Sequence, residues 1–87
     1  MELGEVELAA LGAQGVNDCC CVYDRENDEI YLCYTGAFSE KDVKAYLRGV
    51  LPRFAMPEHF VHLDSIPYTA NMKANRLELA RTVIPKK

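Results

Sequence analysis

Two cations, Lys73 and Arg76, lie in the polar loop Thr69-Ala70-Asn71-Met72-Lys73-Ala74-Asn75-Arg76, between a predicted strand and a predicted helix. Both side chains bind anions, because the lysine ammonium is a compact charge with three donors and the arginine guanidinium is a planar fork of donors. A lysine in a polar loop is nevertheless most often a solvated surface charge. The arginine has two ordinary interpretations as well, capping and solvation. The loop on its own therefore permits an anion-binding role without requiring one.

The cysteines and histidines form neither a recognisable metal site nor a catalytic triad. Three of the cysteines are consecutive, so on a strand they would point to alternating faces and could not converge on one zinc ion. The two histidines are three residues apart on a predicted strand and would also lie on opposite faces. No nucleophile elbow and no glycine-rich phosphate loop is present. We expect no metal site, and we expect free thiols that fill the core in a reducing cytosol, at Cys19, Cys20, Cys21 and Cys33.

The elements that must position the loop are helices and strands in mixed order. A first short helix is expected over 3–11, ended by Gly12, with Glu5 and Glu7 as helix N-terminal charges. Two segments that are apolar at successive positions are predicted to be strands of a hairpin, and this pattern indicates that both faces of the hairpin are covered. A second helix should start at Ser39 with a capping box and run to the residue before Pro52. The expected ranges are helices at 3–11, 39–51 and 76–82 and strands at 16–23, 30–35 and 59–63. The predicted fold class is α+β, a small three-stranded sheet packed by two to three helices.

Length and composition limit what such a chain does alone. The 87 residues are 49% hydrophobic and 26% charged, which is typical of one small globular domain rather than a complete enzyme with its own deep cleft. Net charge is −8 over residues 1–43 and +5 over 44–87. The basic half lacks the interleaved aromatic residues of a nucleic-acid stripe, and no segment is apolar enough to span a membrane. We expect a soluble, cytoplasmic domain that binds neither nucleic acid nor membrane.

Four blocks in order along the chain carry a resemblance to a known family. They are Glu2-Leu3-Gly4-Glu5-Val6-Glu7, Leu51-Pro52-Arg53-Phe54-Ala55-Met56-Pro57, Phe60-Val61-His62-Leu63-Asp64-Ser65-Ile66-Pro67 and Asn71-Met72-Lys73-Ala74-Asn75-Arg76. Together they resemble the C-terminal subdomain of adenylate-forming (ANL superfamily) enzymes, and most closely the amino-acid adenylation domains of nonribosomal peptide synthetases. The resemblance covers essentially all of residues 1–87.

The resemblance implies one lid subdomain whose large N-terminal, ATP-binding domain is not among these residues. In that family the large domain activates a carboxylic acid with ATP as an acyl-adenylate. The small domain then rotates, and the phosphopantetheine thiol of a carrier protein, or coenzyme A, takes the acyl group. The implied partners are the large adenylation subdomain of the same full-length chain and a carrier protein. ATP and Mg²⁺ would be bound mainly by the large domain, with no cofactor in this fragment, which alone would be inactive.

At residue level, Lys73 matches the family's catalytic lysine of the adenylation step. Asn71 and Arg76 would support the loop that carries it, and Gly4 and Glu5 match the motif that follows the hinge. Met72 and Asn75 depart from the usual pattern, which has glycine before the lysine and aspartate two residues after it. Glycine there implies a backbone conformation that methionine resists.

Several alternatives stay open. The chain is either such a lid or a free-standing, non-catalytic module that binds a carrier protein or another subunit. Within the family, an acyl-CoA ligase or a D-alanine–carrier-protein ligase also fits, because the specificity residues would lie in the large domain. An unrelated α+β fold is the remaining interpretation.

Overall fold

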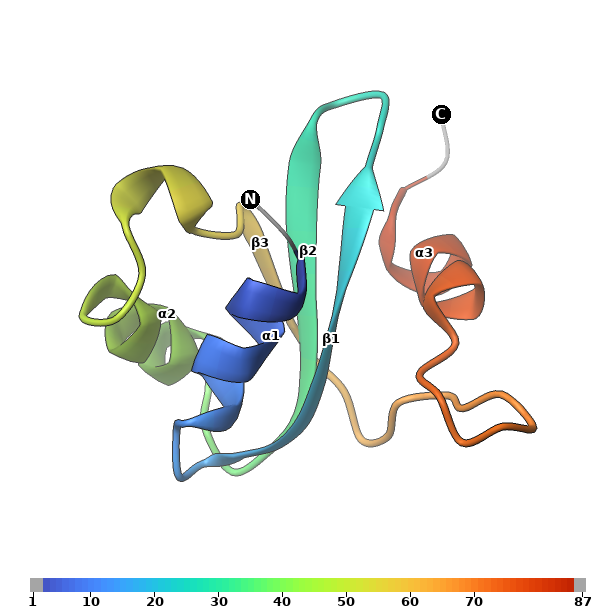
Figure 1. The fold of residues 1–87 in the computed structure, drawn as a ribbon, viewed down its shortest axis with the longest axis horizontal. Coiled ribbons are helices and arrows are strands. Elements are labelled where there is room, and N and C mark those ends of the chain that lie inside the picture. The colour runs from blue at the N-terminus through green and yellow to red at the C-terminus, as the bar shows by residue number, and fades with distance from the viewer. Residues whose placement is uncertain (1–2, 86–87) are drawn as a thin grey trace.

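The computed structural model describes residues 3–85, which form three α-helices, one 3₁₀ turn and a three-stranded sheet (Figure 1). In chain order the elements are α1 Leu3–Leu11, β1 Val16–Asp24, β2 Glu29–Gly36, α2 Glu40–Arg48, η1 Arg53–Ala55, β3 His59–His62 and α3 Arg76–Val83. This is the predicted α+β architecture, so the fold class is confirmed. The strand and helix boundaries agree with those expected from the sequence to within one residue except at the end of α2.

The sheet is mixed, with β2 in the centre. The strands β1 and β2 pair antiparallel as the predicted hairpin, with Cys20 opposite Cys33 and Cys21 opposite Leu32. The strand β3 pairs with the other edge of β2 in the parallel sense, and α2 is the crossover between them. A parallel pair needs such a crossover because the chain must return to the end of the sheet where the first strand began.

Both faces of the sheet are covered, as the continuous apolar runs predicted. In Figure 1, α1 and α2 lie to one side of the sheet and α3 to the other. On the α1 and α2 side, Cys19, Cys21, Leu32 and Tyr34 join one buried cluster. The second cluster, on the α3 side, contains side chains that alternate with these along the strands, together with two residues from beyond β3. Its buried members are Cys20, Val22, Tyr31, Cys33, Ile66 and Leu79.

The predicted start of the second helix is confirmed, whereas its predicted end was wrong. The Ser39 hydroxyl accepts a hydrogen bond from the Asp42 N–H at 3.2 Å, and the Asp42 carboxylate accepts one from the Ser39 N–H, also at 3.2 Å. The helix ends at Arg48 rather than at residue 51. Gly49 caps it, the last bonds tighten to three-residue spacing, and Val50 is half exposed instead of continuing the buried stripe.

Candidate functional site

The predicted lysine loop is a small, ordered hairpin. Its base is the antiparallel bridge between Tyr68 and Ala74, extended by a 2.8 Å hydrogen bond from the Asn75 N–H to the Pro67 carbonyl. Near its tip, Lys73 accepts a 2.7 Å hydrogen bond at its carbonyl from the Thr69 N–H and donates its own N–H to the Thr69 hydroxyl at 3.3 Å. The backbone of Lys73 is therefore held by Thr69, and its side chain is exposed.

The residue before the lysine adopts the conformation that glycine favours. Met72 has a φ of 63°, in the left-handed region, and its side chain is 80% exposed. Its N–H donates to the Thr69 carbonyl at 2.9 Å. The turn thus keeps its geometry with methionine in the glycine position, and the methionine side chain points into solvent beside Lys73.

The other two residues assigned to this loop differ in their surroundings. Asn71 is exposed at the hairpin tip. Arg76 opens α3, three residues after Lys73, where Asn75 caps the helix by accepting from the Glu78 N–H at 3.1 Å. The Arg76 side chain is neither a cap nor merely solvated.

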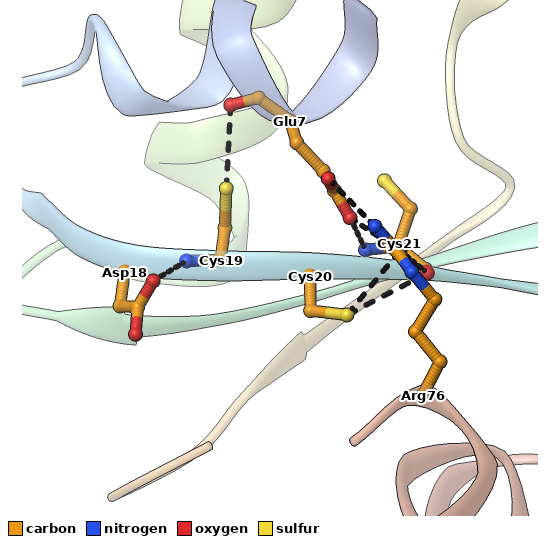
Figure 2. A network of polar contacts seen from close by, with 6 residues as sticks. All are labelled: Glu7, Asp18, Cys19, Cys20, Cys21 and Arg76. Atoms are coloured by element: carbon orange, nitrogen blue, oxygen red, sulfur yellow. Dashed lines mark hydrogen bonds and ion pairs between the residues drawn. The ribbon is translucent and has the colours of Figure 1, made fainter. Parts of the chain in front are cut away.

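A polar network joins Arg76 to the first helix and the first strand (Figure 2). Its guanidinium forms a two-pronged ion pair with the Glu7 carboxylate, with N···O distances of 2.6 Å and 3.1 Å. The same guanidinium donates to the Cys21 carbonyl at 2.6 Å and contacts the Cys20 sulfur at 3.4 Å. The Glu7 carboxylate also accepts from the Cys21 N–H at 2.6 Å. Three elements, α1, β1 and α3, therefore meet at one carboxylate.

Electrostatics favour the charged form of this pair. Burial by itself would raise the pKa of Glu7, but the hydrogen bonds from Arg76 and from the Cys21 N–H, together with the Arg76 charge, outweigh it and leave that pKa below its usual value. The hydrogen bond to Glu7 in turn raises the pKa of Arg76. The interpretation of Glu7 as a simple helix N-terminal charge was therefore wrong. No signal within the helix could have found this pairing, because the partner of Glu7 lies 69 residues away in the sequence.

The two residues matched to the motif after the hinge, Gly4 and Glu5, lie in the first turn of α1 and are exposed. Nothing lies within 4 Å of the position that a Gly4 side chain would occupy. The exposed side of the first turn is thus open, whereas Val6 and Glu7 face the domain.

The cysteines and histidines have ordinary structural surroundings. All four thiols are free and buried. His59 stacks on Tyr31, which belongs to the buried cluster on the α3 side, and it lies 2.9 Å from a Glu29 oxygen. His62 stacks on Tyr34, which belongs to the buried cluster on the α1 and α2 side. Among residues 3–85, no three metal-binding side chains gather to hold an ion.

A surface hollow of about 610 Å³ lies between α2 and η1, away from the lysine loop. Basic and apolar side chains line it, namely Lys44, Arg48, Leu51, Arg53, Met56 and Pro57. No described helix has the length and apolar character that crossing a bilayer requires. Lys73 itself presents an exposed side chain on a hydrogen-bonded turn.

Comparison with known proteins identifies the family to which the fold belongs. The family model described as the AMP-binding enzyme C-terminal domain matches residues 5–73, a span that begins in α1 and ends at Lys73. The chain belongs to this family. The resemblance inferred from the four sequence blocks is thereby confirmed, and the interpretation as an unrelated fold was wrong.

The relatives are nonribosomal peptide synthetases. Surfactin synthase subunit 3 of Bacillus subtilis is 36% identical over 87% of this AMP-binding C-terminal domain, which spans 6% of that protein. Zwittermicin A synthase ZmaJ of Bacillus cereus is 32% identical over 92% of the domain, which spans 16% of it. Among solved structures, Klebsiella oxytoca NpsA, in complex with 3-hydroxyanthranilyl-AMSN, superposes with a TM-score of 0.86 at 26% identity, over 98% of the domain and 18% of that chain. The domain thus corresponds to a small part of each relative.

Proposed function

We propose that this domain is the lid of an ATP-dependent ligase that activates an amino acid, or a similar carboxylic acid, and loads it onto the phosphopantetheine thiol of a carrier protein. Membership of the AMP-binding C-terminal family over a span that ends at Lys73 carries the proposal. The nonribosomal peptide synthetase relatives support an amino acid as substrate and a carrier protein as acceptor.

The first half-reaction suits an exposed lysine on a rigid turn. A carboxylate oxygen of the substrate attacks the α-phosphorus of ATP, the bond to pyrophosphate breaks, and an acyl-adenylate forms. Two anions must approach each other, and negative charge moves onto the leaving group. The Lys73 ammonium would donate to both groups, because it is compact and its backbone is fixed by Thr69.

The second half-reaction does not need this lysine. A phosphopantetheine thiolate attacks the acyl carbonyl, a thioester forms, and AMP leaves. A group required in only one of two steps is best carried on the part that moves between them. ATP and Mg²⁺ would be bound mainly by the large N-terminal domain, and the carrier protein would be met after the lid rotates.

The free-standing binding module is the alternative, and the unusual loop residues were its main support. Met72 takes the left-handed conformation without disrupting the turn, and Asn75 caps α3 through its side chain. Neither departure therefore argues against a working lysine loop. The alternative remains testable, because it requires the isolated chain to bind a phosphopantetheinylated carrier protein without ATP and without a large domain.

The proposal can be tested by exchange into a relative. We would replace the matching segment of zwittermicin A synthase ZmaJ by this chain and measure pyrophosphate exchange with a panel of amino acids. Exchange well above that of ZmaJ lacking the segment supports a catalytic lid. Exchange no greater than that background, with tight carrier binding by the isolated chain, would establish the binding module instead.

Lys73→Ala in this chimera is the residue-level test. We expect adenylation to fall by about 100-fold to 1,000-fold, the usual loss when one preorganised donor to a developing charge is removed. Transfer of the acyl group from a preformed adenylate to the thiol should change little. Lys41→Ala, which removes an exposed lysine of α2, is the matched control. Equal losses in both half-reactions would contradict the assigned role.

A further inference from the structure

We propose that Glu7 is a positioning residue for the lysine loop: through Arg76 it fixes the base of the Lys73 hairpin to α1 and β1. The inference deepens the proposed function and rests on it, since the loop matters for adenylation only if Lys73 acts there. Glu7 is 69 residues from Arg76 in sequence, yet their side chains form an ion pair with an N···O distance of 2.6 Å.

The hairpin that carries Lys73 is held mainly by itself. The hydrogen bonds of Thr69, Met72 and Lys73 all close within the hairpin. The tip is exposed, Ala74 at the base is partly buried against the second cluster, and the fully buried neighbours lie beyond the base at Ile66 and Leu79. In Figure 1 this segment projects from the sheet as a long loop before α3. Its direction is therefore set by whatever fixes its two ends.

The outgoing end is fixed at Arg76. The helix that follows has only eight residues, and Leu79 is its one fully buried side chain among those described. Ala80 and Val83 are partly buried against the same cluster, so the apolar anchors of α3 all lie at least three residues after Arg76, and a further contact fixes the end of the helix next to the loop. Arg76 supplies it through three acceptors at once, the Glu7 carboxylate, the Cys21 carbonyl and the Cys20 sulfur (Figure 2).

Glu7 in turn is the acceptor that makes this contact directional. Its two oxygens engage two guanidinium nitrogens, and one of them also accepts from the Cys21 N–H. A carboxylate can satisfy all three donors, and a guanidinium held by two parallel bonds has a fixed plane. A glutamine has the same shape but only one oxygen, so its amide N–H₂ would face a guanidinium nitrogen in either orientation, and in one of them the Cys21 N–H as well. Glu7→Gln therefore removes the alignment while keeping the volume.

The network also links the lysine loop to the helix that bears Gly4 and Glu5. Glu7 follows Glu5 by two residues in α1 and is only 17% exposed at its side chain, whereas Glu5 is exposed. The ion pair thus connects α1 directly to the residue that opens α3, beside the contacts that both helices make with β1.

The first measurement is made on the chain itself. Amide hydrogen exchange of Thr69, Met72 and Lys73 is compared between the wild-type chain and Glu7→Gln. We expect the variant to exchange faster at these three amides, with the sheet amides of β1 and β2 unchanged except that of Cys21, whose N–H acceptor is altered by the substitution. Glu26→Gln, which removes an exposed carboxylate from the β1–β2 turn, is the matched control and should leave the loop amides unchanged.

The second measurement is a double-mutant cycle in the ZmaJ chimera. Glu7→Gln should lower the rate of adenylation by about 10-fold to 100-fold, since misplacing a reacting group by about 1 Å has effects of that size. Thiol transfer should be unaffected. In the Lys73→Ala background, Glu7→Gln should have almost no further effect, because the residue it positions is already gone.

The outcomes separate the two proposals. Unchanged loop exchange in Glu7→Gln overturns the positioning role. Equal losses in both half-reactions, or a full loss repeated in the Lys73→Ala background, also overturn it, because a merely structural residue behaves in that way. Faster loop exchange in the Glu7→Gln chain would support the link between Glu7 and the loop. Normal adenylation by the chimera that carries Lys73→Ala would overturn the proposed role of Lys73.

Discussion

At the scale of single residues, the positive φ of Met72 shows how the loop tolerates its unusual sequence. A residue with a side chain in the left-handed region is destabilised by about 1 to 2 kcal/mol, and Met72 adopts this conformation in the turn of the hairpin. The methionine side chain gains little in return, because it is 80% exposed. The conformation is therefore imposed by the hydrogen bonds of the hairpin and not by packing of the side chain.

This conformation gives a prediction with a definite sign. We expect Met72→Gly to be more stable than Met72→Ala by up to about 1 kcal/mol, because glycine avoids the steric cost while alanine retains it. Urea unfolding of both variants measures the difference. At Arg81, inside α3, the order should be reversed, since glycine is the poorer residue in a helix. An alanine variant at 72 more stable than the glycine variant would contradict the assigned backbone strain.

The place of the loop between a strand and a helix could be predicted from sequence, whereas the contact of Glu7 with Arg76 could not. The role of Lys73 stays a prediction that rests on the order of its neighbouring blocks along the chain. The partner of Arg76 lies at the opposite end of the sequence, and an acidic residue early in a helix already has an adequate local explanation in the helix dipole. Only the folded arrangement brings Glu7, Cys21 and Arg76 together.

At the scale of elements, local signals fixed most of the boundaries. The apolar runs predicted both strands of the hairpin and their burial on two faces, and the pair Ser39 and Asp42 predicted the start of α2. The end of α2 was misjudged because Pro52 is a strong stop signal and Gly49 a weaker one. The parallel pairing of β3 with β2 depends on how α2 crosses over the sheet, which residue patterns within one element do not specify.

The capping box of α2 is worth a measurable amount of stability. Ser39→Ala removes the acceptor for the Asp42 N–H and should lower the free energy of unfolding by about 1 kcal/mol. Ser65→Ala, at an exposed position outside the helices and strands, is the control and should change it much less. Urea denaturation of the two variants is the measurement. Equal stabilities would show that the start of the helix is held by packing of Phe38 and Val43 instead.

At the scale of the whole molecule, the uneven charge of the sequence is partly neutralised by folding. Both ion pairs among residues 3–85 join the acidic first half to the basic second half: Glu7 pairs with Arg76, and Glu29 with His59 when that histidine is protonated. Folding therefore brings charged side chains from the two halves of the sequence into contact.

The buried thiols make the stability of the whole fold depend on pH in the alkaline range. Burial raises the pKa of Cys19 to about 12, that of Cys20 to about 11 and that of Cys33 to about 12, and it raises the pKa of Cys21 as well. Unfolded, these thiols ionise at an ordinary value near 9.0. A raised folded pKa means that the folded state holds its protons more tightly. The stabilisation is complete below pH 9 and is lost as pH rises from there towards the folded values.

The expected loss is large for a domain of this size. Each thiol that ionises only on unfolding lowers the free energy of unfolding by up to about 1.4 kcal/mol per pH unit, so the loss from all four together approaches about 5.6 kcal/mol per unit well above pH 9. Urea unfolding under reducing conditions between about pH 8 and pH 10.5 should show this slope. This range extends roughly one to two units around the ordinary pKa of a cysteine thiol. Cys33→Ala should reduce it by about a quarter. An unfolding free energy that stays flat across this range would mean that the thiols are reached by water in the folded state, against the burial of all four.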